Sequence, residues 1–295
     1  MSSIAYITDN NMLEFHRIHG HKTMNFWRFD SKQFSAFTKG DLLFFLVKKS
    51  ERPNSSEKGI LGCGRLDSIQ TSSIKRIWDN YQQLNGYNSY NEMREAIKRL
   101  SKDSKMPRSM NCLFLTDIIY FNEPLYLSDF GIKISNYMES YTYLNNFDEG
   151  IEKKLLETAK NNGIDIWASM LSDTGDKEFE KQLIINEIND LHKELKDLNY
   201  NKKQDKQVIK LAKVFKEENL DFSLFKNSSI EFFKVENNTV TIVFVNIAKE
   251  LNSDEYKKLI GHLLLYKNKC EDFDYKVKFR IINDLSDSLI SYIGD

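Results

Sequence analysis

The sequence predicts an α+β protein: an N-terminal β-barrel with inserted helices, followed by a helical segment and a small α+β domain. Short aromatic and branched runs between turn formers fill the first half, which is typical of strands. Helical spacing of apolar residues interrupts them, dominates after residue 147, and gives way to strand-like runs from residue 230. With 295 residues, 41% of them hydrophobic, the chain can bury more than one core. We therefore expect domains at 1–147, 148–219 and 220–295.

The first strands follow from composition and turn residues. Ile4–Thr8 is an apolar run that ends in the polar cluster Thr8–Asn11, which we expect to be a loop that presents hydrogen-bonding groups. Leu13–Ile18 fits a helical turn and an extended piece equally well. Ser50–Lys58 contains a proline and is expected to be a hairpin loop. Further strands are expected at Asn25–Phe29, Leu42–Val47 and Gly59–Leu66.

Glycines mark the last of these strands. Gly59, Gly62 and Gly64 leave parts of it without side chains, so another group can approach its backbone closely. Gly40 and Asp41 form a tight turn ahead of the preceding strand. We expect the approaching group to be a ring system.

Two helices are expected as an insertion between strands. Ile74, Ile77 and Tyr81 lie at helical spacing, as do the apolar residues between 93 and 100. After Pro107 the strand pattern returns, and residues 136–146 close the first domain. The strands expected there are Cys112–Leu115, Ile118–Phe121 and Pro124–Leu127. The outer faces of the inserted helices carry Lys75, Arg76, Arg94, Lys98, Arg99 and Lys102.

The second half begins with helices, expected at residues 149–161, 176–198 and 204–218. Apolar residues of the middle helix repeat at 4-3-4-3 spacing, the pattern of a short coiled-coil seam. Packing on its own domain and self-association or partner binding both stay open. The seam consists of Ile184, Ile188, Leu191, Leu195 and Leu198.

A compact β-β-α-β unit is expected to end the chain. Strands Ile230–Val235 and Thr239–Val245 are joined by an Asn237-Asn238 hairpin turn. A helix at Asp254–Lys269 and a strand at Tyr275–Ile282 follow.

Charge is distributed unevenly along the chain. Residues 1–147 carry 19 Lys and Arg against 15 Asp and Glu, and the remainder carries 23 against 28. The basic excess is greatest between Lys48 and Arg108, with 13 against 7, which a polyanion could use and which a solvated face would also explain.

The scattered cysteines and histidines argue against a disulfide framework or a metal site. Three cysteines lie far apart, and His16, His19 and His21 have no cysteine or acidic ligand at a recognisable spacing, so we expect ordinary surface histidines. No signal peptide and no apolar stretch of membrane-spanning length is present, so a cytoplasmic protein without a membrane is expected.

The C-terminal unit loosely resembles the end of a PD-(D/E)XK nuclease, but catalytic residues are missing from it. Thr239–Val245 contains no acid, Val245–Ile247 stands where acid-x-lysine would be, and Glu231 and Glu236 flank the strand. Dinucleotide, P-loop and nucleophile-elbow motifs are absent. Buried strand cysteines explain Cys63 and Cys112 better than a catalytic role.

Three blocks of the first half occur in a distinctive order: Tyr6–Asn11, Asn25–Arg28, and Gly40–Phe45 followed by Gly59–Gly64. In order and spacing they resemble the EVE domains and, more distantly, the YTH domains, both of the PUA-like superfamily. The resemblance covers residues 1–147. It implies a PUA-like β-barrel whose pocket receives a modified base between aromatic side chains.

The resemblance also implies roles for individual residues. Trp27 falls where such families place a cage aromatic, with Phe26 and Phe29 expected on the opposite strand face, and Trp78 is a second candidate; a core role stays open for both tryptophans. An indole covers the flat face of a base, and stacking is worth roughly 1–3 kcal/mol per base. The expected base pocket comprises Thr8, Asp9, Asn11, Phe26, Trp27, Arg28, Gly62, Gly64 and Trp78. The expected phosphate contacts are Lys48, Lys49, Arg65, Arg76 and Arg99.

The function implied is recognition of a modified base, with phage or foreign DNA in restriction or antiviral defence as the leading ligand. A reader of modified RNA is an alternative. Residues 176–295 would then recruit an effector nuclease or form a homo-oligomer. A modification-dependent endonuclease with a PD-(D/E)XK-like C-terminal domain, or an interaction scaffold with an empty barrel, are alternatives of other classes. No cofactor is expected.

Overall fold

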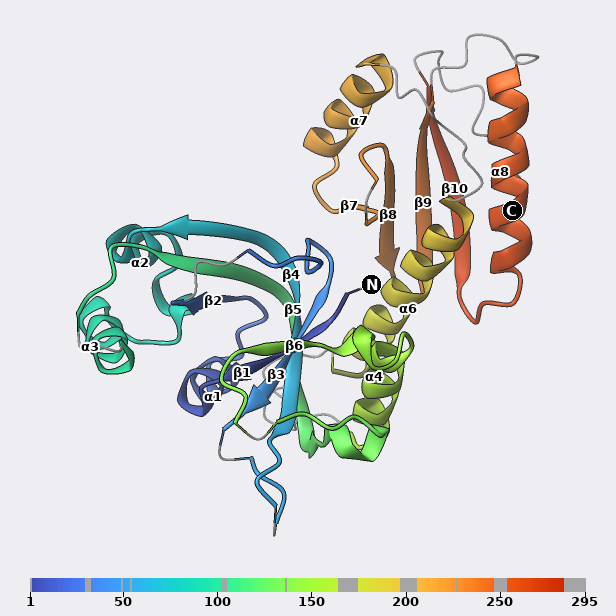
Figure 1. Cartoon of the computed structure of the whole chain (residues 1–295). Coiled ribbons are helices and arrows are strands. Elements are labelled where there is room, and N and C mark those ends of the chain that lie inside the picture. The colour runs from blue at the N-terminus through green and yellow to red at the C-terminus, as the bar shows by residue number, and fades with distance from the viewer. Residues whose placement is uncertain are drawn as a thin grey trace. The chain divides into compact units, whose positions relative to one another are not determined.

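The computed structural model describes residues 2–29, 33–48, 50–53, 55–101, 105–135, 137–163, 175–196, 206–226, 228–246 and 254–283. The chain divides into two compact units, residues 1–180 and 181–295, each with its own sheet (Figure 1). Both units combine helices with strands, which confirms the α+β class. The residues expected as a helical connector, 148–219, are divided between the two units.

Six strands form the sheet of the first unit: β1 (Ile4–Thr8), β2 (Met24–Arg28), β3 (Leu42–Val47), β4 (Gly59–Ser72), β5 (Met110–Leu125) and β6 (Tyr141–Tyr143). Their order is β2-β5-β4-β3-β1-β6, with β1 and β3 parallel and the other neighbours antiparallel. Within the described residues β2 and β6 are the two edges and do not pair. The expected closed barrel is therefore wrong, because closure requires the outer strands to pair and β6 has only 3 residues.

Strands β4 and β5 are longer than the sequence predicted. The predicted strand Gly59–Leu66 continues to Ser72, and the separate strands predicted between residues 112 and 127 are one strand. Register shifts interrupt the pairing of β4 with β5, and Asp117 inside β5 has a φ of 50°. These bulges break the alternation of side chains, so the apolar pattern divides into shorter runs.

Helix α1 (Asn10–Ile18) begins directly after β1, and the loop expected at Thr8–Asn11 is wrong. Asp9 is the N-cap: its carboxylate accepts a hydrogen bond from the backbone N–H of Met12 at 3.0 Å, which satisfies a free helix donor. The predicted insertion between β4 and β5 is confirmed as α2 (Ile74–Tyr81), the 3₁₀ helix η1 (Gln82–Asn85) and α3 (Tyr90–Leu100). Further helices that the structure describes in this unit are η2 (Leu127–Phe130), η3 (Leu144–Asn146) and α4 (Ile151–Asn161).

The side chains of β2 alternate between two apolar clusters. Met24 and Phe26 belong to the main core, together with Tyr6 and Phe45. Trp27 belongs to a second cluster, which the side chains of α2 and α3 complete. Because successive strand residues point to opposite faces, this alternation places one face of β2 beneath the insertion.

The second unit contains a four-stranded sheet with the order β10-β9-β8-β7. Its described strands are β7 (Ser223–Leu224), β8 (Glu231–Glu236), β9 (Thr239–Asn246) and β10 (Lys276–Asn283). Its described helices are α7 (Lys206–Glu218), α8 (Asp254–Cys270) and most of α6 (Gly175–Lys196). β8 and β9 are antiparallel, and their connection at Asn237 and Asn238 has φ angles of 47° and 59°, as a type I′ turn requires. β9 and β10 are parallel and joined through α8, so the predicted β-β-α-β order is confirmed.

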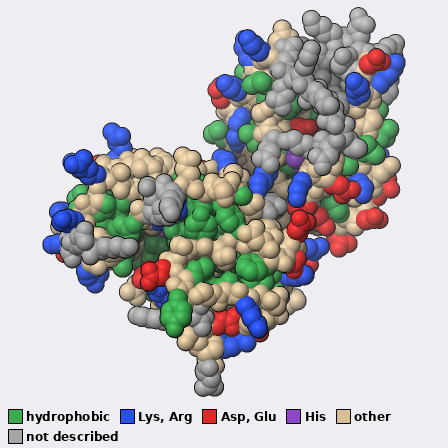
Figure 2. Space-filling view, viewed as in Figure 1, with side chains coloured by type: hydrophobic (Ala, Val, Ile, Leu, Met, Phe, Trp, Pro, Cys, Tyr) green, Lys and Arg blue, Asp and Glu red, His purple; other side chains and the backbone are tan. Residues whose placement is uncertain are grey.

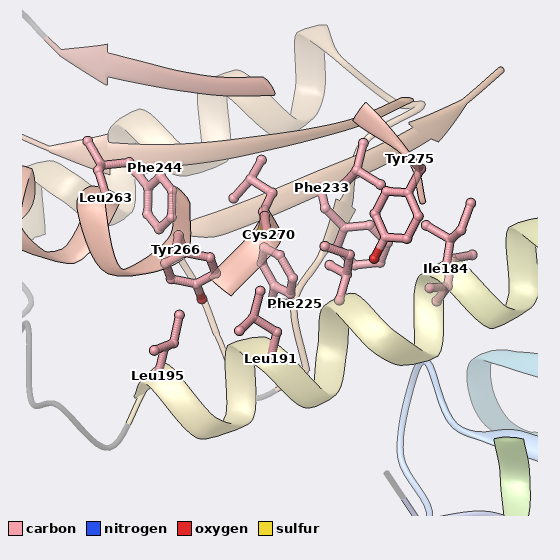
Figure 3. Packing of buried hydrophobic residues seen from close by; sticks show 14 of the residues in the cluster. Ile184, Leu191, Leu195, Phe225, Phe233, Phe244, Leu263, Tyr266, Cys270 and Tyr275 are labelled. Carbon is pink, nitrogen blue, oxygen red and sulfur yellow. The ribbon is translucent and has the colours of Figure 1, made fainter. Parts of the chain in front are cut away.

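Helix α6 (Gly175–Lys196) carries the predicted seam and packs it within its own chain. Ile184, Leu191 and Leu195 contact an apolar cluster with Phe233 from β8 and Tyr266 from α8 (Figure 3). The structure therefore does not support a coiled coil for the described part of the seam; Leu198 lies outside the described residues. Among the helices that the structure describes, none is both long and apolar enough to cross a membrane.

Candidate functional site

The candidate site is built on one row of side chains along β2. Asn25 and Trp27 lie two residues apart, so their side chains share the strand face beneath the insertion. Phe29 follows in the same row directly after the strand. The exposed fraction rises from 0% for Asn25 to 9% for Trp27 and 42% for Phe29. We call these residues the β2 row; it runs from the interior to the surface.

Aromatic side chains surround Trp27. Its ring centroid lies 5.9 Å from that of Phe29 in an edge-on arrangement and 6.3 Å from that of Tyr87, at an interplanar angle of 32°. The expectation that Phe29 lies on the opposite strand face is therefore wrong. The indole N–H donates a hydrogen bond to the backbone carbonyl of Asn85 at 3.2 Å, which fixes the ring against η1.

Asn85 also fixes the orientation of Asn25. The Nδ2 of Asn85 donates to the carbonyl of Gln82 at 2.8 Å, so its Oδ1 is free to accept from Nδ2 of Asn25 at 2.7 Å. Asn25 Nδ2 also lies 3.4 Å from Sγ of Cys112. Oδ1 of Asn25 is consequently a buried acceptor that has no partner among the described residues. Such an atom costs about 1–3 kcal/mol, so a donor from water or a ligand is expected there.

Tyr87, the aromatic neighbour of Trp27, also carries a polar group, which Asp9 and Arg99 influence electrostatically. Burial, and then the nearby carboxylate of Asp9, raises the pKa of Tyr87 to about 12, while Arg99 opposes the shift. The phenol is therefore protonated at neutral pH and can donate a hydrogen bond. Asn11 is exposed in the first turn of α1.

Trp78 lies in the same cluster as Trp27. It is half-buried on α2 and packs against the apolar residues beneath the insertion, with its ring 6.2 Å from that of Tyr90 at 47°. The structure thus brings both predicted cage tryptophans to one part of the first unit. Asn25, Asn85 and Tyr87 were not among the pocket residues predicted from the sequence. For Asn25 the available signal was its position two residues before Trp27, which places both side chains on one strand face.

Several other predicted pocket residues have partners inside the fold. Thr8 is buried and its hydroxyl donates to the carbonyl of Tyr6 at 2.9 Å. Phe26 lies in the main core, and the buried Arg28 has its guanidinium 4.1 Å from the ring centroid of Phe34.

The glycines of β4 face protein atoms. A Cβ on Gly62 would lie 2.4 Å from the carbonyl oxygen of Ile119, and one on Gly64 would lie 2.4 Å from Cδ1 of Ile118. The close approach that the glycines permit is therefore made by β5 in this structure.

The predicted phosphate contacts fall in three places. Arg76 on α2 and Arg99 on α3 are exposed, and Figure 2 shows Lys and Arg side chains gathered over these helices. Lys48 is exposed after β3, at the base of the β3–β4 hairpin loop, which lies away from α2 and α3 in Figure 1. Arg65 is buried, and its guanidinium donates to the carbonyl of Gly40. Lys49 lies outside the described residues.

The three N-terminal histidines form a cluster, and the expectation of surface histidines is wrong for His16. Its side chain is fully buried, with Nδ1 2.9 Å from Nδ1 of His21. Burial, with smaller effects of His21 and His19, lowers the pKa of His16 to about 3. Among the described residues no group of three or more His, Cys, Asp or Glu side chains could hold a metal ion.

The acids considered for a nuclease centre do not meet. Glu231 begins β8 beside His192, with 3.4 Å between Oε2 and Nε2, whereas Glu236 ends the strand and pairs with Lys234. Residues an odd number of positions apart on a strand face opposite sides, so the two carboxylates cannot share one metal ion in this structure.

No protein-family model matches the chain, and no curated protein matches it. Three solved structures of the ASCH protein from Zymomonas mobilis align with 52% of this chain at 14% identity. A tyrosine-to-phenylalanine mutant is covered over 97% of its length with a TM-score of 0.37, and a serine-to-alanine mutant over 94% with 0.38. The form without a named substitution is covered over 93% with 0.36.

Proposed function

We propose that the first unit binds nucleic acid and places one modified base against the β2 row. The observation that carries this proposal is the row itself, in which a buried acceptor, an indole and an exposed phenyl ring follow one another toward the surface. A flat heterocycle with a hydrogen-bond donor on its edge complements such a row, because the rings cover its face and Asn25 accepts its donor.

The base must displace protein contacts to reach Trp27. The indole is 9% exposed and 6.3 Å from Tyr87, so a stacked base requires these two rings to separate further. Trp27 lies on the sheet and Tyr87 in the insertion, between η1 and α3. Movement of the insertion away from β2 would open the site. The base must also leave its duplex, and this flipping costs least where the base is damaged or unpaired.

The basic surface of the insertion supports the same function. Arg76 and Arg99 would contact phosphates on either side of the bound base, and each contact makes affinity depend on salt. Modified phage DNA in restriction or antiviral defence remains the leading proposed ligand, and modified RNA remains its alternative.

A binding panel tests the proposal. The full chain is titrated with DNA and RNA oligonucleotides that carry or lack single base modifications, at two salt concentrations. Phe29→Ala should weaken binding of the preferred oligonucleotide, since loss of stacking costs roughly 1–3 kcal/mol, or about 5- to 150-fold. Phe147→Ala removes a ring of similar exposure, 49%, outside the row and should leave binding unchanged.

Trp27 is tested with two substitutions because it also packs in a core cluster. Trp27→Phe should retain part of the affinity, and Trp27→Ala should lose more, provided that circular dichroism shows both variants folded. If Trp27→Ala binds every oligonucleotide as the parent does, the assignment of the base to the β2 row is wrong.

A further inference from the structure

A row of cations lies on one face of β10 in the second unit. Lys276, Lys278 and Arg280 alternate along the strand and are exposed, whereas the intervening Val277 and Phe279 pack toward the core. Alternate residues of a strand are about 6.6–6.8 Å apart. The three cations therefore form a line that suits an extended polyanion.

The neighbouring strand supplies hydroxyl groups to the same face. Lys276 is paired with Thr239 and Lys278 with Thr241 in the parallel register of β10 with β9. Both threonines are half-buried. Hydroxyl groups beside lysines suit phosphate oxygens, which accept hydrogen bonds from Thr as well as from Lys and Arg.

Lysines on this face differ in their charge partners. Lys234 on β8 is neutralised, with Nζ 2.8 Å from Oδ2 of Asp221 and 2.5 Å from Oε2 of Glu236. Lys276 and Lys278 form no ion pair with any residue that the structure describes. Among the lysines that the structure describes on this face of the sheet, those without an ion pair therefore lie on β10.

Helix α7 borders this row without covering it. Phe215 of α7 packs with Phe232 and Val243 on this face, and the guanidinium of Arg280 lies 5.6 Å from the ring centroid of Phe215. Arg280 is therefore next to the helix, and Lys278 and Lys276 extend away from it along the strand. Further exposed lysines on α7, at its outer surface, are Lys206, Lys210 and Lys213.

Protection of the sheet edge is a second explanation for these lysines, and an experiment must distinguish it from phosphate binding. β10 is an edge strand among the described residues, and charged side chains on edge strands prevent pairing with other chains. Glutamate serves that purpose as well as lysine does, since any charge opposes edge pairing. Contact with phosphate, in contrast, depends on the sign of the charge.

We propose that the β10 face is a second nucleic-acid contact, which binds the phosphate backbone of a single strand through Lys276, Lys278 and Arg280. The contact is independent of base identity. It would hold a strand on the second unit whether or not a base occupies the first.

The test is charge reversal in the full chain. Lys276→Glu/Lys278→Glu is compared with Lys258→Glu/Lys267→Glu, which makes the same change at exposed lysines of α8, the helix packed on the other face of the sheet. Binding of an unmodified single-stranded oligonucleotide is measured by fluorescence anisotropy over a series of salt concentrations. Loss of two phosphate contacts should reduce the slope of log K against log salt by about 1.4, and the α8 variant should keep the parent slope.

The outcomes are distinct. A lower slope for the β10 variant alone, with Phe29→Ala unchanged in this assay, supports the β10 contact even if base recognition by the first unit fails. Equal slopes for parent and β10 variant, with both proteins monomeric, overturn the proposal and leave edge protection as the role of the lysines. Equal losses in the β10 and α8 variants also overturn it, because only net charge would then matter.

Discussion

Lowering the pH should destabilise the first unit through His16. The side chain is fully buried, and its pKa falls from 6.5 in the unfolded chain to about 3 in the folded one, chiefly because burial disfavours the imidazolium. A depressed folded pKa means that stability is complete above the unfolded value and is lost as the pH falls from about 6.5 toward 3. Between pH 7.5 and 5.0 this linkage amounts to about 2 kcal/mol.

Urea unfolding followed by tryptophan fluorescence measures this effect, with His16→Leu as the comparison, since leucine fills similar space and cannot bind the proton. The parent should lose about 2 kcal/mol more than the variant over the same pH range. His21, whose pKa is also lowered, chiefly by burial and then by His19, is present in both proteins. Equal losses in parent and variant would refute the proton linkage at His16.

Two further predictions concern packing. Gly62→Ala would bring a Cβ to 2.4 Å from the carbonyl oxygen of Ile119, so urea unfolding should show the first unit destabilised by about 1–3 kcal/mol. The control is Gly261→Ala in α8, where a Cβ would meet nothing within 4 Å, and it should not destabilise the second unit. In the folded protein, the cysteine thiols should resist a disulfide reagent at pH 8 and react only in denaturant. Cys63, Cys112 and Cys270 are buried, and burial raises the pKa of Cys63 and Cys270 to about 12. Rapid labelling of the folded protein would contradict the buried placement.

The sequence predicted most elements because local signals and packing agree. The spacing of Ile74 and Ile77 predicted α2, and both side chains are buried beneath the insertion. The Asn237-Asn238 turn between two β-branched runs predicted the β8–β9 hairpin, because asparagine tolerates positive φ. Boundaries failed where tertiary pairing extends a strand past its apolar pattern, as in β4 and β5.

The candidate site was predicted only in part. Trp27 was predicted from the resemblance of the first half to known families, but the sequence alone cannot show that Asn85, 58 residues away, holds its indole N–H. Arg65 looked like an exposed phosphate ligand because charge usually lies at the surface, whereas β4 buries it beside Gly40. Barrel closure likewise depends on pairing between distant edges, which no local pattern encodes.

The most direct test of the central claim is the ratio of affinities for modified and unmodified oligonucleotides of one sequence, measured for the parent and for Phe29→Ala and Trp27→Phe. If the β2 row contacts the base, the parent should prefer one modification, and both variants should reduce that preference while the salt slope stays constant. An unchanged ratio in both folded variants, or a parent without any preference across the panel, would contradict base recognition at this row.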